Sequence, residues 1–319
     1  MAVYTHLGAE DLAALIAAYD VGELVSAKGI AEGVSNSNWL IETTHARYIL
    51  TMYELRIDTA QLPFFLGLLD HLSARGCPVP RTIHDREGAA FRMVGDKAVA
   101  LIEFLPGVSV DRPTAEQARA VGTALAQLHH AVADFPLKGA QTIGLAEWDR
   151  LIHLCGTDRL EAIAPGLSAT AYAELSYLGA HWPTGLPHGV VHCDLFPDNV
   201  LMLGNRVTGL IDFYFSAEDY FAYDLAVTHA AWCFGPGGHA FRPEISDALL
   251  AGYALGRELS DDERAELPVL VRGACMRFLS SRAYDWVFTA ADALVVRKDP
   301  LDFARRLAFY RANGESLFA

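Results

Sequence analysis

The feature that most constrains the fold of this 319-residue chain is a change in its hydrophobic pattern near Pro106. Before Pro106, short apolar runs bounded by turn residues predict a helix over 62–74 and strands over 25–30, 39–43, 47–53 and 98–104. After Pro106, apolar residues recur at helical spacing almost to the end of the chain. Because the length exceeds the usual size of one core, we expect an α+β fold of two lobes. Residues 1–105 form the strand-rich lobe and residues 106–319 the mostly helical lobe.

Short apolar runs interrupt the helical region and enclose a polar loop. Residues 189–191, 199–203 and 207–211 predict buried strands, the last two joined by a turn at Gly204. The loop that follows the first strand is His192-Cys193-Asp194-Leu195-Phe196-Pro197-Asp198-Asn199, and Asp212 follows the last strand. Three oxygen-bearing side chains therefore leave neighbouring strand ends and can converge there: Asp194, Asn199 and Asp212.

This set of oxygen groups is typical of phosphoryl transfer. In the H-x-D-x-x-x-x-N loop of kinases, the Asp accepts the proton of the substrate hydroxyl, and the Asn and a second Asp on the next strand bind metal. In that register Asp194 is the predicted base, Asn199 and Asp212 are predicted Mg²⁺ ligands, and His192 braces the loop. An isolated H-x-D is most often a capped turn, but three groups in the right order beside apolar strands favour the kinase interpretation. A zinc site would need a further Cys or His at ligand spacing.

The same segments resemble the aminoglycoside phosphotransferase and choline kinase superfamily, the small-molecule branch of the protein-kinase-like fold. The resemblance rests on Val191 to Val200, on Leu210-Ile211-Asp212-Phe213 and on Tyr223-Asp224-Leu225-Ala226, and it extends over nearly the whole chain. Residues 29–39 and 48–54, with Arg277-Phe278, Ser281-Arg282 and Asp285-Trp286, are similar to the bacterial homoserine kinases of this superfamily. The resemblance implies an ATP- and Mg²⁺-dependent kinase that phosphorylates the side-chain hydroxyl of homoserine, in threonine biosynthesis.

The nucleotide is expected between the lobes. A turn rich in small polar residues lies between the first two predicted strands, and its amides and hydroxyls are expected to cover the phosphates: Gly33, Ser35, Asn36, Ser37 and Asn38. The turn lacks G-x-G-x-x-G, so by itself it predicts only a hairpin. Residues 102–107 resemble the lobe-connecting segment of the superfamily, in which the carbonyl of Glu103 and the amide of Leu105 would face the adenine edge.

Two positions depart from the family pattern: Thr51, and Tyr214, which stands where protein kinases have the Gly of Asp-Phe-Gly. The strand that usually carries a phosphate-binding Lys or Arg has Thr51, a neutral hydroxyl, at that position. The positive field near the phosphates must then come from Lys28, from Arg56, from a loop amide or from Mg²⁺ alone.

The acceptor site is predicted in the helical lobe. Arg282 and Asp285 lie at contact spacing on one predicted helix, where the Arg would clamp a carboxylate and the Asp would take an ammonium. Asp194 is expected to contact the acceptor hydroxyl, and Tyr214 to wall the pocket. The alternative interpretation is an Arg282–Asp285 salt bridge on a solvated face, with Tyr214 in the core.

Composition excludes several other classes. The formal charge of 25 − 39 = −14, without a basic cluster, argues against a nucleic-acid partner. Five scattered cysteines without a C-x-x-C pair favour free thiols in a reducing compartment. The first residues lack a signal-peptide pattern and no apolar run is long enough to span a bilayer, so we expect a cytoplasmic protein with no membrane partner. The sequence does not predict the oligomeric state.

Two other functions stay open from the sequence. One is a kinase for another small hydroxylated compound, such as choline, an aminoglycoside or a fructosamine. The other is a nucleotide-binding pseudokinase, which Thr51 favours and the intact Asp194, Asn199 and Asp212 disfavour.

Overall fold

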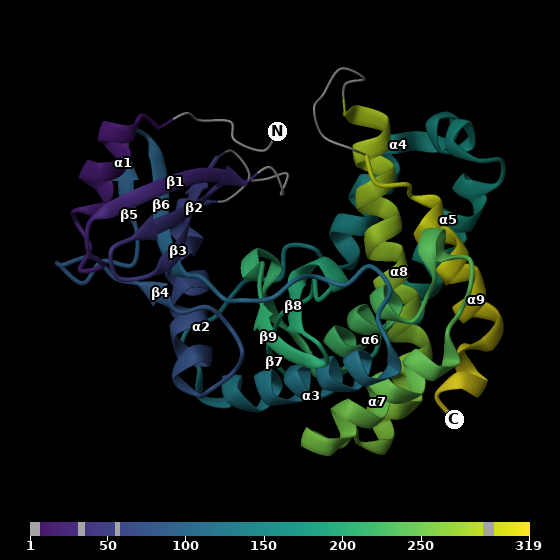
Figure 1. Cartoon of the computed structure of the whole chain (residues 1–319). Helices are drawn as coiled ribbons and strands as arrows, with labels where there is room; N and C mark the ends of the chain where they lie inside the picture. Colours follow the sequence, from purple (N-terminus) through teal and green to yellow (C-terminus); the bar gives the residue numbers. More distant parts are fainter. Residues whose placement is uncertain (1–6, 31–35, 55–57, 290–296) are drawn as a thin grey trace.

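The computed structural model describes residues 7–30, 36–54, 58–289 and 297–319. Along the chain, the described residues build an antiparallel sheet up to Glu103 and a mostly helical region after it (Figure 1). The sheet has the order β1-β2-β3-β6-β4, with β5 also paired to β6. Its strands are β1 (Leu24–Ile30), β2 (Asn36–Thr43), β3 (Arg47–Tyr53), β4 (Thr82–Ile83), β5 (Arg92–Val94) and β6 (Lys97–Glu103).

Strand alternation gives this sheet two buried faces. Ile41 of β2 and Leu50 of β3 point to one face, where α1 (Ala9–Ile16) covers them. Tyr53 points to the other face and joins a cluster that includes α2 (Leu62–Ala74) and the helices beyond it. A sheet covered on both faces explains why its strands contain near-continuous apolar runs.

The helical region surrounds one long central helix. Helix α8 (Asp261–Phe288) begins with a capping box between Ser260 and Glu263 and contacts helices on several sides (Figure 1). The other helices are α3 (Ala115–Ala131), α4 (Leu145–Ile163), α5 (Leu167–His181), α6 (Phe221–Trp232), α7 (Pro243–Gly256) and α9 (Leu301–Leu317). None of the helices that the structure describes has the length and hydropathy needed to cross a bilayer.

Two small sheets of two strands each lie beside the helices. Strand β8 (Val200–Leu203) pairs with β9 (Arg206–Leu210), and β7 (His188–Val191) pairs with β10 (Ala217–Tyr220). Val108, in the segment that connects β6 to α3, exchanges two backbone hydrogen bonds with Met202 of β8. This contact ties the β8–β9 pair to the connecting segment, between the sheet and the helices (Figure 1).

The predicted α+β arrangement is confirmed, with three differences in detail. Residues 36–38 were predicted in a turn but belong to β2, because they continue its pairing with β3. The short strands β4, β5 and β10 were not predicted. Helix α4 contains a kink at Gly156, whose φ of 72° favours glycine and which the helical spacing of apolar residues does not predict.

The division into lobes at residue 105 stays a prediction. Strand β6 ends at Glu103, close to that boundary. One hydrophobic cluster nevertheless includes Tyr53, Leu66 of α2 and Leu125 of α3, so apolar packing continues across it.

Candidate active site

The loop that carries Asp194 is held by a buried carboxylate. The backbone amides of His192 and Cys193 donate to the two carboxylate oxygens of Asp224, at 2.8 and 2.7 Å. Cys193 has a φ of 59°, so the chain turns sharply here and points both amides the same way. Burial works to raise the pKa of Asp224, but hydrogen bonds from His129 and the loop amide outweigh it and hold the pKa below its ordinary value.

Asp224 is itself oriented by a chain of buried side chains. Nε2 of His129 lies 3.0 Å from Asp224, and Nδ1 of His129 lies 2.8 Å from the hydroxyl of Tyr253. Burial lowers the pKa of His129, so the neutral ring donates from Nε2 and accepts at Nδ1. His129 was not predicted as a site residue, because it reaches Asp224 only through the packing of α3 against α6.

His192 links the loop to the strand that ends at Asp212. Its Nδ1 accepts from the amide of Asp194 at 3.2 Å, and its Nε2 donates to the carbonyl of Ile211 at 3.0 Å. The ring is fully buried and burial lowers its pKa, which keeps it neutral. The proposed brace therefore connects the predicted base with the predicted metal strand.

The three predicted oxygen groups lie at one place. Asn199 donates from Nδ2 to the carbonyl of Asp194 at 2.8 Å and to its carboxylate at 3.2 Å. The carbonyl of Asn199 accepts from the amide of Ile211 at 3.0 Å, which brings Asp212 beside it. Burial raises the pKa of Asp194, and the Arg277 guanidinium opposes this rise.

Asp212 has a raised pKa and an unusual backbone conformation. Burial, Asp194 and Asp198 together raise its pKa to about 7. The residue as a whole is exposed, so a cation can reach it from solvent. Asp212 also adopts the left-handed conformation, with φ 67° and ψ 60°, a strain of order 1–3 kcal/mol that recurs at functional sites.

This donor set fits Mg²⁺. The carboxylates of Asp194 and Asp198 both raise the pKa of Asp212, so these groups form a region of excess negative charge, which a divalent cation would neutralise. The described residues contain no group of three or more His, Cys, Asp or Glu side chains that could hold a metal. Asn199 and Asp212 would therefore be completed by water and phosphate oxygens, the coordination that Mg²⁺ usually takes.

The predicted nucleotide residues divide between the two faces of the sheet. Thr51 donates to Asn38 at 2.8 Å, and the Tyr53 and Tyr214 hydroxyls are 3.0 Å apart. The buried Oδ1 of Asn36, which pairs with Tyr53, has no hydrogen-bond partner among the described atoms. The hydroxyl of Ser37, by contrast, donates to Glu54 at 2.6 Å, on the face toward α1. Gly33, Ser35 and Arg56 lie outside the described residues.

The remaining nucleotide positions lie where the sheet leads into the helical region. Glu103 is the last residue of β6, and its carboxylate accepts from the amide of Arg81 at 3.3 Å. Leu105 follows in the irregular connection, with its side chain near Gly209. Their contacts with adenine stay predictions.

Two cations near Asp194 were not predicted as site residues. Arg277 of α8 is 5% exposed, lies with Nη2 3.8 Å from Oδ1 of Asp194, and donates from Nη1 to the carbonyl of Cys193. Lys298 lies 3.6 Å from Asp198, and its charge works to lower the pKa of both Asp194 and Asp212. Arg277 belongs to a segment that resembles the homoserine kinases, but the local sequence assigns no role to Arg277 or to Lys298, because each reaches the loop through tertiary packing.

Arg282 lies in a different environment from the one predicted. Its Nη1 contacts the carboxylate of Asp302 and the carbonyl of Asp299, both at 3.2 Å, and its guanidinium lies 4.6 Å from the ring centroid of Phe303. Arg282 thus connects α8 to the start of α9. The clamp predicted for Arg282 and Asp285 is untested by these contacts and stays a prediction.

Comparison with known proteins agrees with this geometry. Residues 26–265 match the phosphotransferase enzyme family. The chain is 47% identical to a homoserine kinase of Xanthobacter autotrophicus over 98% of this chain and 97% of that protein. It is also 47% identical to a homoserine kinase of Methylobacterium radiotolerans, over 98% and 96% of the two chains.

Solved structures of lower identity share the fold. A spectinomycin phosphotransferase superposes with a TM-score of 0.72 at 15% identity, covering 98% of this chain and 100% of that one. An amicoumacin kinase gives a TM-score of 0.70 at 16% identity, over 97% and 94% of the two chains. On the family match and the full-length identities, this chain belongs to the phosphotransferase enzyme family and, within it, to the homoserine kinases.

Proposed function

We propose that this protein is a homoserine kinase, which transfers the γ-phosphoryl group of ATP, with Mg²⁺, to the side-chain hydroxyl of L-homoserine. The observation that carries the proposal is the 47% identity with homoserine kinases over nearly the whole chain. The retained Asp194, Asn199 and Asp212 support an active enzyme over a pseudokinase, because each oxygen group needed for transfer is present.

Asp194 is the proposed base. It would align the acceptor hydroxyl and accept its proton as the oxygen attacks the phosphorus in line, with no phosphoenzyme intermediate. Asn199 restrains the Asp194 carboxylate. The nearby Arg277 and Lys298 favour its ionised form, which is the form that accepts a proton.

Asn199 and Asp212 are the proposed ligands of Mg²⁺, which would neutralise the phosphate charge. Thr51 cannot supply that charge, but Lys28 is a candidate from β1. It pairs with Leu40 of β2, and alternation places it on the same sheet face as Asn38 and Thr51. We also propose a cytoplasmic location, which suits five cysteines that are all free and buried.

An ADP-release assay tests the function. Homoserine should give the highest kcat/KM in a panel with threonine, serine, choline, a fructosamine and an aminoglycoside. Higher turnover of choline or an aminoglycoside would contradict the substrate and leave the kinase assignment in place. No release with any acceptor, together with ATP binding that is indifferent to Mg²⁺, would indicate a pseudokinase.

A further inference from the structure

Homoserine carries a carboxylate and an ammonium besides its hydroxyl, so its recognition requires a cation and an anion near Asp194. This requirement rests on the proposed function. Arg277 and Asp219 are the described residues whose positions meet it. One comes from the middle of α8 and the other from β10, the strand paired with the strand that leads into the catalytic loop.

Arg277 is a cation fixed beside the base. Its guanidinium is held by the Cys193 carbonyl and by the ring of Phe278, whose centroid lies 4.6 Å away. The 3.8 Å between its Nη2 and Asp194 is an ion-pair distance and too long for a direct hydrogen bond. The charge of this side chain therefore lies at the base without occupying the carboxylate oxygen that would receive the acceptor hydroxyl.

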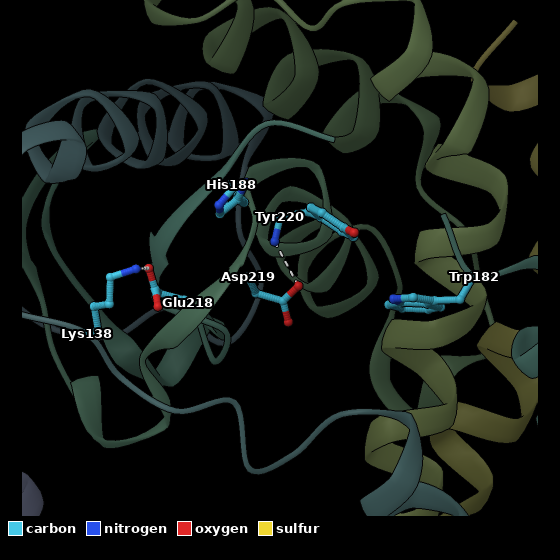
Figure 2. Close-up of a pocket in the computed structure, with 6 residues that line it drawn as sticks. All are labelled: Lys138, Trp182, His188, Glu218, Asp219 and Tyr220. Carbon is cyan, nitrogen blue, oxygen red and sulfur yellow. Dashed lines mark hydrogen bonds and ion pairs between the residues drawn. The ribbon is translucent and has the colours of Figure 1, made fainter. Parts of the chain in front are cut away.

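Asp219 lines an open cavity of about 360 Å³ together with Lys138, Trp182, His188, Glu218 and Tyr220 (Figure 2). Its carboxylate accepts from the amide of Tyr220 at 2.7 Å and from the side chain of Gln141. In the described part of the chain it has no ion-pair partner, whereas the neighbouring Glu218 pairs with Lys138 at 3.3 Å. In Figure 2 the Asp219 carboxylate lies between that pair and the ring of Trp182.

Arg277 acts electrostatically on both carboxyl groups. It is 3.8 Å from Asp194, and its charge also works to lower the pKa of Asp219. Asp219 is opposite Gly189 of β7, and Gly189 precedes His192, the first residue of the catalytic loop, by three residues. The backbone of Asp219 therefore lies about 10 Å from the start of that loop, measured along the strand. An extended homoserine spans about 5 Å from hydroxyl to amino nitrogen, and a hydrogen bond of about 3 Å at each end brings the total to a similar length.

We propose that Arg277 and Asp219 select a zwitterionic acceptor, with Arg277 contacting the α-carboxylate and Asp219 the α-ammonium of the molecule whose hydroxyl lies at Asp194. Trp182 would then pack against the aliphatic part of the acceptor. This assignment differs from the Arg282 clamp, because Arg282 is already paired with Asp302.

Three acceptors test it in the full-length enzyme: homoserine, 4-hydroxybutanoate, which lacks the amino group, and 3-aminopropan-1-ol, which lacks the carboxylate. Asp219→Asn should lower kcat/KM for homoserine roughly thirtyfold or more, as expected when one partner of a charged pair is removed. The same variant should leave kcat/KM for 4-hydroxybutanoate within about threefold, because that acceptor has no ammonium to lose. An equal loss with all three acceptors would make Asp219 structural and overturn its assignment.

The variant Arg277→Lys tests the proposed contact between Arg277 and the α-carboxylate of the acceptor. The ratio of kcat/KM for homoserine to that for 3-aminopropan-1-ol should fall at least about tenfold, because Lys cannot reproduce a bidentate contact. Both acceptors use Asp194, so the ratio cancels any disturbance of the base. An unchanged ratio would overturn the role of Arg277. Arg264→Lys, on an exposed part of the same helix, is the matched control.

The unmutated enzyme gives a check that does not depend on folding of a variant. It should strongly prefer homoserine over both analogues. Turnover of 3-aminopropan-1-ol equal to that of homoserine would overturn the carboxylate contact while leaving homoserine kinase activity intact. Absence of homoserine turnover would instead contradict the proposed function itself.

Discussion

Nδ1 of the buried His192 accepts a hydrogen bond from the backbone amide of Asp194, 3.2 Å away. Since Nδ1 is the acceptor, the proton of the neutral ring is on Nε2, which donates to the carbonyl of Ile211. One side chain thus sets the position of Asp194 relative to Asp212. The catalytic loop and the metal strand are expected to move as one unit.

Asp194→Asn should reduce kcat about a hundred- to ten-thousandfold, because the amide accepts no proton from the hydroxyl. Affinity for ATP with Mg²⁺ should survive, since the proposed metal ligands remain. Steady-state kinetics and nucleotide calorimetry measure the two effects, with Asp149→Asn on the exposed face of α4 as the control. Near-normal turnover in folded Asp194→Asn protein would exclude Asp194 as the base.

Asp224→Ala should lower the free energy of unfolding by about 3–5 kcal/mol, because two buried amides and His129 lose their acceptor. It should also lower kcat with little change in the KM for ATP, since the loop loses its fixed position. Asp224→Asn keeps one acceptor oxygen and should recover part of both losses. Urea unfolding and kinetics at one pH check this. Equal losses in Asp224→Ala and Asp224→Asn would contradict the hydrogen-bonding role of Asp224.

The metal-dependent affinity for ATP should rise with pH. Asp212 must be ionised to bind a cation, and its pKa is raised to about 7. The increase in ATP affinity that added Mg²⁺ produces, measured by calorimetry between pH 5.5 and 8.5, should therefore grow up to about neutral pH and then level off. Asp212→Asn should remove this dependence together with most of the gain. A gain that is constant over the range would contradict the metal role of Asp212.

His229 should make stability depend on pH in the acid range. Burial lowers its pKa to about 3, whereas the unfolded chain binds a proton near pH 6.5. The neutral ring therefore stabilises the fold fully above about pH 6.5, and this contribution falls as the pH drops. Between pH 7.5 and 5.5 the difference in unfolding free energy between the unmutated protein and His229→Gln should shrink by about 1.4 kcal/mol. A constant difference would mean that His229 has the same pKa in the folded and unfolded states, which would contradict a buried neutral ring.

Arg282→Lys separates the two roles considered for Arg282. Given its contacts with Asp302, Asp299 and Phe303, we expect a loss of about 1 kcal/mol in unfolding free energy. The KM for homoserine should stay unchanged, because the structure already pairs this guanidinium with α9. A selective rise in that KM, with an unchanged KM for ATP, would favour the clamp predicted from the sequence.

The catalytic loop and the metal strand were predictable because they are local. Asp194, Asn199 and Asp212 lie within one strand-loop-hairpin unit, where residue spacing alone brings side chains together. The main strands and helices were predictable for the same reason, since each follows a periodic run of apolar residues. The polar residues 36–38 were misplaced because their conformation depends on pairing with β3, which local composition does not report.

Tertiary structure decided which distant residues surround that unit. Arg277 is 84 residues from the carbonyl that it binds at Cys193, and His129 is 95 residues from Asp224. Their sequence neighbourhoods predict an ordinary helix in both cases. The sequence by itself therefore determined the chemistry of the loop, whereas the packing of α3, α6 and α8 decided which charges lie beside it. The physical reason is that burial and charge pairing depend on contacts between elements, and no periodicity within one element encodes them.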